Sequence, residues 1–136
     1  MYKKTIRYED YNGVEREEDF YFNLSKAEAI EMELSHVGGF KGYIERITAC
    51  EDRKALLKEF KELILLSYGE KSPDGKRFIK SEELSEAFAQ TEAYVNLYVE
   101  LVSNSDAAAA FVNGIWSASA AKEIAEKMRG QGEVVG

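Results

Sequence analysis

The strongest constraint on the fold is an amphipathic stretch in the middle of the chain, DRKALLKEFKELILLSYG at residues 52–69. Its apolar residues recur at the spacing that gathers side chains on one face of a helix: Leu56, Leu57, Phe60, Leu63 and Ile64. Three further residues, Leu65, Leu66 and Tyr68, widen that face near its end. The pattern predicts a helix over 52–68 that begins at Asp52, packs against several neighbours and ends at a left-handed Gly69.

The N-terminal residues 2–22 predict a β-hairpin whose turn signal is Asn12-Gly13. A two-residue loop would place Ile6 and Phe20 on opposite faces, whereas a three-residue loop pairs them on one face. We therefore expect the three-residue loop, with Gly13 in a left-handed or bulged conformation. The charged run EREED at 15–19 is too polar for a buried strand and predicts an exposed edge.

Helix signals follow the hairpin. Ser25 and Glu28 have the spacing of a capping box, and Gly38-Gly39 suits the end of that first helix. Residues 40–49 suit a short helix, which Gly42 weakens. Residues 69–80 read as a loop around the turn Pro73-Asp74-Gly75.

The second half of the chain is also predicted to be helical. Ser81 begins a long helix with two apolar stripes, unless Thr91 caps a new helix after a kink near Gln90. Ser105 opens an alanine-rich helix in which Asn113-Gly114 is a candidate break. A last helix over 117–129 carries an apolar face of Ala121, Ile124, Ala125 and Met128.

These elements predict an α+β fold, in which the N-terminal β-hairpin packs on a mainly α-helical bundle of about five helices with 52–68 at its centre. The length suits a single domain over 1–136. Within it we expect the hairpin at 2–22, the bundle at 25–116, and a C-terminal helix with a loose tail at 117–136.

The composition of the chain argues against several classes of function. The formal net charge of −7 argues against general binding to nucleic acid or to an anionic membrane. No apolar run has the length of a membrane span, and the N-terminus lacks the apolar core of a signal peptide. The lone Cys50 permits no internal disulfide and favours a reducing compartment.

The sequence contains no recognisable motif for catalysis or for binding a metal or a cofactor. His36 is the only histidine, which excludes a metal site built on several histidines. Aligning Gly75 with the invariant glycine of a calcium loop puts Ser81 where the bidentate glutamate belongs, so we expect a turn and no metal. Nucleophile elbows and phosphate loops are also absent from the sequence, and we expect no cofactor and no enzymatic activity. The many aromatic residues suit either the core or a protein interface.

Three stretches of the sequence carry a resemblance to a known family: DFYFNLSKAEAIEMEL at 19–34, FKELILLSYGEKSPDGKRFIKSEELSEAFAQTEAYVNLYVEL at 60–101, and AAAAFVNGIW at 107–116. In these stretches the sequence resembles the tail assembly chaperones of long-tailed, siphovirus-like bacteriophages and prophages of Gram-positive bacteria. The resemblance covers residues 1–116, so we expect the last twenty residues to lie outside the family-like region.

The resemblance implies a protein that acts in the cytoplasm of the bacterial host, keeps the phage tape measure protein soluble and promotes tail tube assembly. Its partners would be the tape measure protein and the tail tube protein, with self-association permitted, and it would be absent from the mature virion. Because the last helix lies beyond the resemblance, Ala121, Ile124, Ala125 and Met128 are the candidate partner-binding residues. Two alternatives remain open: a structural tail or head-completion protein, and an acidic protein that binds a host target.

Overall fold

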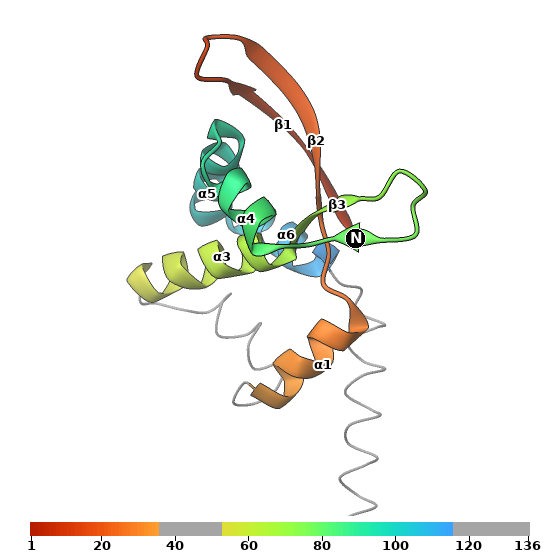
Figure 1. Cartoon of the computed structure of the whole chain (residues 1–136). Helices are drawn as coiled ribbons and strands as arrows, with labels where there is room; N and C mark the ends of the chain where they lie inside the picture. Colours follow the sequence, from red (N-terminus) through yellow and green to blue (C-terminus); the bar gives the residue numbers. More distant parts are fainter. Residues whose placement is uncertain (36–52, 116–136) are drawn as a thin grey trace, which may run out of the picture.

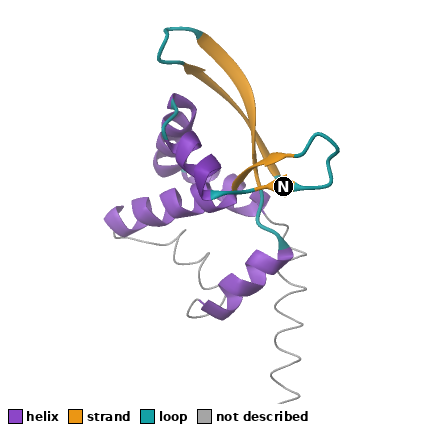
Figure 2. Ribbon diagram, viewed as in Figure 1, coloured by secondary structure: helices purple, strands orange, loops and turns teal. Residues whose placement is uncertain are grey.

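The computed structural model describes residues 1–35 and 53–115 of the chain. Four strands and five helices lie in these ranges (Figures 1 and 2). The strands are β1 (Tyr2–Glu9), β2 (Glu15–Phe22), β3 (Tyr68–Lys71) and β4 (Phe78–Ile79). The helices are α1 (Lys26–Ser35), α3 (Arg53–Ser67), α4 (Glu82–Ala89), α5 (Glu92–Ser103) and α6 (Ser105–Ile115).

The strands form one antiparallel sheet in the order β1-β2-β3-β4, and the helices pack against it. In Figure 1 the β1–β2 hairpin rises as a curved arm alongside α4 and α5. The arm is attached to α5, because Lys4 Nζ lies 2.9 Å from Glu100 Oε1 and the Asn96 side chain donates to the Arg7 carbonyl at 3.0 Å. The predicted α+β architecture, with an N-terminal hairpin on a helical layer, is confirmed.

The predicted hairpin register is wrong by two residues, although its parity is right. Phe20 pairs with Lys4 and not with Ile6, and the loop comprises the five residues 10–14. The longer loop closes because the Asp10 carboxylate accepts from the backbone N–H groups of Asn12 and Val14, at 2.9 and 3.0 Å. Gly13 has the expected positive φ, 78°. Since parity decides which face a side chain occupies, Ile6 and Phe20 still face the helices together.

Helix α3 supplies much of the core, as predicted. Phe60, Leu63 and Ile64 are buried, whereas Leu57, which was expected on the same face, is 37% exposed. The core around α3 is aromatic: the Phe22 ring lies among three others, with centroid distances of 5.4–5.8 Å to Tyr68, Phe88 and Phe111. These four rings come from two strands, β2 and β3, and two helices, α4 and α6, so elements far apart in the sequence meet in the core.

The stretch predicted as a loop over 69–80 is a short hairpin, which is the main error in the expected fold. Helix α3 ends at Ser67, and Gly69 lies in β3 without a left-handed φ. A Cβ atom on Gly69 would stand 2.6 Å from the Phe78 ring and 2.8 Å from the Ile79 carbonyl oxygen. Glycine is needed there for close strand packing and not for ending the helix. The turn prediction itself is right, because Gly75 has φ 74°.

Helix boundaries follow the capping residues. Ser25 and Glu28 form the expected capping box, with their reciprocal bonds at 3.0 and 3.2 Å. Of the two alternatives for the stretch after Ser81, the second is confirmed: it forms two helices, α4 and α5, because Thr91 accepts from the Tyr94 N–H as a new cap. The candidate break at Gly114 does not occur, since α6 continues through it to Ile115.

Several predictions fall outside the described residues: the short helix at 40–49, Asp52 as a helix start, and the environments of His36 and Cys50. The predicted helix over 117–129 falls there as well. Among the helices in residues 1–35 and 53–115, none combines the length and apolar character needed to cross a membrane.

Candidate protein-binding surfaces

The predicted partner-binding residues Ala121, Ile124, Ala125 and Met128 lie outside the described ranges, so the structure does not locate them. In the described part of the chain, no three or more His, Cys, Asp or Glu side chains gather as a metal site would require. The surfaces that these residues do form are suited to binding another protein chain, and they are described below.

The loop at 72–77 uses its polar groups to hold its own turn. The Ser72 hydroxyl donates to Asp74 Oδ1 at 2.6 Å, and the Lys76 N–H donates to the same oxygen at 3.0 Å. The hydrogen bond from Ser72, followed by that from the Lys76 N–H, lowers the pKa of the Asp74 carboxyl. The Arg77 N–H in turn donates to the Ser72 hydroxyl at 3.0 Å. A carboxylate engaged in this way stabilises a tight turn.

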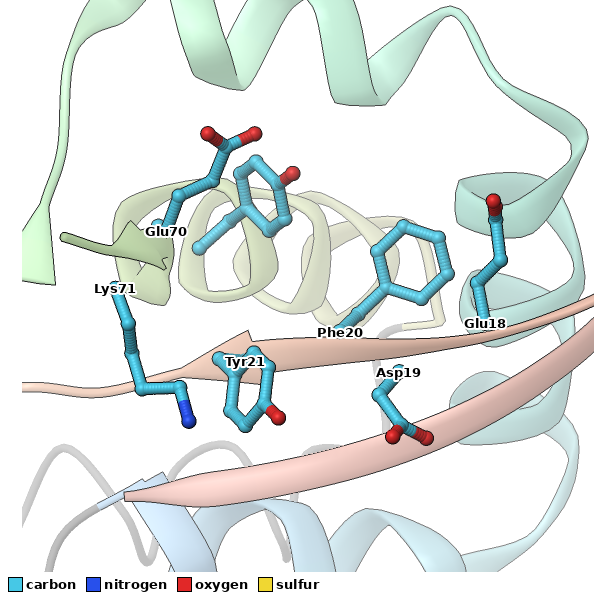
Figure 3. A pocket seen from close by; sticks show the side chains of 8 residues that line it. Glu18, Asp19, Phe20, Tyr21, Glu70 and Lys71 are labelled. Atoms are coloured by element: carbon cyan, nitrogen blue, oxygen red, sulfur yellow. The ribbon is translucent and has the colours of Figure 1, made fainter. Parts of the chain in front are cut away.

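A groove opens where β3 leaves β2. It has a volume of about 390 Å³ and is lined by Glu18, Asp19, Phe20, Tyr21, Tyr68, Gly69, Glu70 and Lys71 (Figure 3). The side chains alternate about β2: Figure 3 shows Glu18 and Phe20 on one side of the strand and Asp19 and Tyr21 on the other. Lys71 Nζ lies 4.3 Å from the centre of the Tyr21 ring. The groove therefore has an aromatic floor and a charged rim.

Ion pairs line both faces of the hairpin arm. On the face turned away from the helices, Arg7 Nε lies 3.1 Å from Glu17 Oε2 and Lys3 Nζ lies 3.7 Å from Asp19 Oδ2. On the other face Arg16 Nε lies 2.6 Å from Asp10 Oδ2, and this hydrogen bond is the main reason why the pKa of Asp10 is lowered. The Tyr8 hydroxyl donates to Glu18, which raises the pKa of Tyr8. These contacts between exposed side chains link the two strands of the arm, and each contributes little to stability because it lies in solvent.

Apolar side chains are exposed on the outer face of α5 and at the tip of the hairpin. Val95 and Val99 lie one helical turn apart and are 40% and 53% exposed. At the tip, Val14 is exposed and Tyr11 reaches Glu92 at the start of α5, where the hydrogen bond to that carboxylate raises the Tyr11 pKa. Exposed aliphatic and aromatic groups of this kind supply contact area for a protein partner.

Reasoning from the sequence alone missed the groove and the exposed face of α5. The groove depends on β3, which the pattern did not predict. The exposed face of α5 depends on the break before Thr91, because Phe88 before the break is buried and Val95 after it is 40% exposed. The sequence contained one indication of this break, because Thr91 was a candidate cap for a new helix after a kink near Gln90.

In the comparison with known proteins, the chain matches the model of one protein family. The model of a family described as phage tail assembly chaperones matches residues 1–134. No curated protein and no solved structure is significantly similar to the chain. The expectation that the last twenty residues lie outside the family-like region is wrong, because the match continues to residue 134. A tail assembly chaperone is not an enzyme and works by binding tail proteins. The chain belongs to the family of phage tail assembly chaperones.

Proposed function

We propose that this chaperone binds the tape measure protein of its phage, keeps it soluble and promotes polymerisation of the tail tube around it. The observation that carries the proposal is the family match over residues 1–134. A tape measure protein is a long helical chain, and such a chain aggregates unless its apolar stripes are covered. A small protein with a net charge of −7 can cover them and add charge at the same time.

Two features of the described surface support this role. Val95 and Val99 provide an exposed apolar strip on α5, and the groove beside β2 provides an aromatic floor. Many copies that each bind weakly along one long chain would give avidity without a single tight site. Self-association of the chaperone is compatible with this mode of binding but is not required by it.

The proposed role also implies where the protein acts and at which stage of tail assembly. We propose that the protein acts in the cytoplasm of a Gram-positive host, on a siphovirus-like tail that is still being assembled, and that it is absent from the mature virion. Mass spectrometry of purified particles tests the last point, with the tube protein as the positive control. Stoichiometric recovery of this protein in the virion would instead favour a structural tail or head-completion protein.

Co-expression with the tape measure protein tests the proposal most simply. We expect the soluble fraction of the tape measure protein to rise several-fold when the chaperone is present. The double variant Val95→Asp/Val99→Asp should reduce this effect, whereas Glu62→Gln on the exposed side of α3 should not. A tape measure protein that is equally soluble with and without the chaperone would contradict the proposal.

We also propose that the predicted apolar face of the last helix, Ala121, Ile124, Ala125 and Met128, contacts the partner. The supporting observation is its three- and four-residue spacing within the family match. The variant Ile124→Asp/Met128→Asp should weaken binding to the tape measure protein without lowering the melting temperature. Lys122→Ala/Glu126→Ala, on the polar positions of the same stretch, is the matched control. A large loss of melting temperature in the first variant would place this face in the core instead.

A further inference from the structure

Strand β2 is paired on both sides only near its C-terminal end. Strand β3 pairs with Tyr21 and Phe22, and then turns away to pair with β4 through Glu70 and Lys71. No strand in the described part of the chain lies beside residues 15–20 on that side, although β1 pairs with them on the other. The segment from Glu15 to Phe20 is therefore an open edge of the sheet.

Two backbone hydrogen bonds show which backbone groups point out of this edge. The Asn23 N–H donates to the Ser67 carbonyl at 2.8 Å, away from β1, whereas the Asp10 N–H donates to the Val14 carbonyl at 2.9 Å between the two strands of the arm. Because backbone groups alternate along a strand, those of Glu15, Glu17 and Asp19 point outward, as Asn23 does. The even-numbered residues between them are bonded to β1.

The opposite edge of the arm, on β1, differs from this one. Its outward carbonyl at Arg7 accepts a hydrogen bond from the Asn96 side chain of α5, at 3.0 Å. Lys4 is also held against α5 by its ion pair with Glu100. Helix α5 thus covers part of the β1 edge, whereas the β2 edge opens into the groove near its C-terminal end (Figure 3).

The groove lies beside the open edge of β2, where an added strand would pair. Phe20 is half-buried on the floor of the groove beside the Tyr68 side chain, on the face of β2 that is turned toward the helices. A strand added to β2 would place one side chain on this floor, because directly paired residues share a face. The residues before and after it in the added strand would point to the other face of the sheet, on which Asp19 and Glu17 lie.

The charge of the edge defines the chemistry of the strand that it accepts. Residues 15–19 contain four carboxylates and one guanidinium, that of Arg16, which is paired with Asp10. Glu17 and Asp19 have basic neighbours on β1, but Glu15 and Glu70 form no ion pair within the described residues. Like charges beside these carboxylates would be unfavourable and lysine or arginine favourable.

We propose that the β2 edge binds an extended segment of a partner protein by strand addition, and that this segment alternates basic residues with apolar ones. The basic side chains lie opposite Glu15, Glu17 and Asp19, and one apolar side chain enters the groove over Phe20. Main-chain hydrogen bonds supply affinity and the alternating side chains supply specificity. This surface is distinct from the helical faces proposed to hold a tape measure helix, so either can fail without the other.

A synthetic hexapeptide, Phe-Lys-Val-Lys-Val-Lys, tests the proposal, because in antiparallel pairing with residues 15–20 it places its lysines opposite Glu15, Glu17 and Asp19 and its phenylalanine opposite Phe20. Hydrogen exchange is followed by NMR on the full-length chain with and without the peptide. We expect exchange at the Glu15, Glu17 and Asp19 amides to slow by at least about tenfold, since these gain a hydrogen bond. Exchange at Arg16 and Glu18 should change little, because β1 already protects those amides.

Two controls separate strand addition from attraction of charge. A peptide of the same sequence, N-methylated at alternate amides, keeps every charge but cannot pair, and should lose most of the binding. In the protein, Glu17→Pro removes one outward N–H without removing a bond to β1, and should also weaken binding. Its matched control, Glu17→Gln, keeps the donor and should retain the amide protection.

The following results would overturn the proposal. One is equal binding of the methylated and unmethylated peptides with no amide protection, which would indicate adsorption to acidic side chains only. Another is protection at Lys3, Thr5 and Arg7, which would place the strand on β1. A third is protection at Glu15, Glu17 and Asp19 that rises with protein concentration in the absence of peptide, which would assign the edge to a second copy of the chain.

Discussion

At the scale of single residues, close contacts explain why particular side chains are small. Gly114 lies within α6, where alanine would normally be the better helix former. A Cβ atom there would stand 2.4 Å from Cδ2 of Tyr2, whose ring packs edge-on against Phe111 at 5.5 Å. Gly114 therefore allows the first strand to lie against the last described helix.

We predict that Gly114→Ala destabilises the protein by about 1–3 kcal/mol, the usual cost of overpacking a core. In a Tyr2→Ala background the same substitution should become neutral or stabilising, because the clash is gone and alanine favours the helix by up to about 1 kcal/mol. Urea unfolding of the four proteins in this cycle measures both effects. A similar cost of Gly114→Ala in both backgrounds would contradict the proposed contact.

A second residue-scale contact joins the start of α1 to the end of β4. Lys80 Nζ lies 2.7 Å from Glu28 Oε1, and the same carboxylate caps α1. Partial burial acts to raise the pKa of Glu28, but the hydrogen bonds from Lys80 and from the Ser25 N–H outweigh it, so the pKa is lowered. Lowering the pKa in the folded state stabilises the fold above the ordinary carboxyl range, and this contribution is lost as the pH falls through the folded pKa.

We therefore predict a pH-dependent effect of Glu28→Gln, which keeps the capping amide acceptor but removes the charge. The variant should melt below the parent at pH 7, and the gap should narrow toward about pH 3, as the Glu28 carboxylate of the parent becomes protonated. Thermal melts at both pH values measure the gap, with Glu62→Gln as an exposed control. The same gap at both pH values would show that the ion pair with Lys80 does not contribute.

At the scale of elements, α3 links the aromatic core to the exposed surface. Leu63 is 1% exposed and Leu66, less than one turn later, is 48% exposed. We predict that Leu63→Ala lowers the free energy of unfolding by roughly 2–5 kcal/mol and that Leu66→Ala changes it by less than about 1 kcal/mol. Urea unfolding compares the two variants. Equal effects would contradict the orientation of α3.

Much of this arrangement could be predicted from local patterns. The capping box at Ser25, the apolar spacing around Leu63 and the turn at Gly75 each act within a few residues, and each was predicted correctly. The two strands at Tyr68–Lys71 and Phe78–Ile79 were not predicted, because they are too short to show periodicity and form through pairing with β2. The groove could not be predicted for the same reason.

The register of the β1–β2 hairpin could be predicted only in part from the sequence. Parity between Ile6 and Phe20 correctly predicted which residues share a face, because the side-chain period of a strand is two. It could not distinguish a three-residue loop from a five-residue loop, since both keep that parity. Asp10 decides between them by accepting two backbone hydrogen bonds within the loop.

At the scale of the whole molecule, the described residues combine an aromatic core with two unlike surfaces that we propose bind protein partners. Exposed valines on α5 suit an apolar helical partner, and the acidic edge of β2 suits a basic extended one. Both surfaces lie on a protein that belongs to the tail assembly chaperones. Two modes of recognition on one small chaperone would allow it to hold one tail protein while engaging another.

The most direct test of the tail assembly role is a phage in which an early stop codon removes this protein alone. Electron microscopy of the lysate then counts complete tails against filled heads. We predict filled heads without tails, insoluble tape measure protein, and restoration of both when the chaperone is supplied from a plasmid. Tails of normal length and number in the absence of the protein would contradict the account.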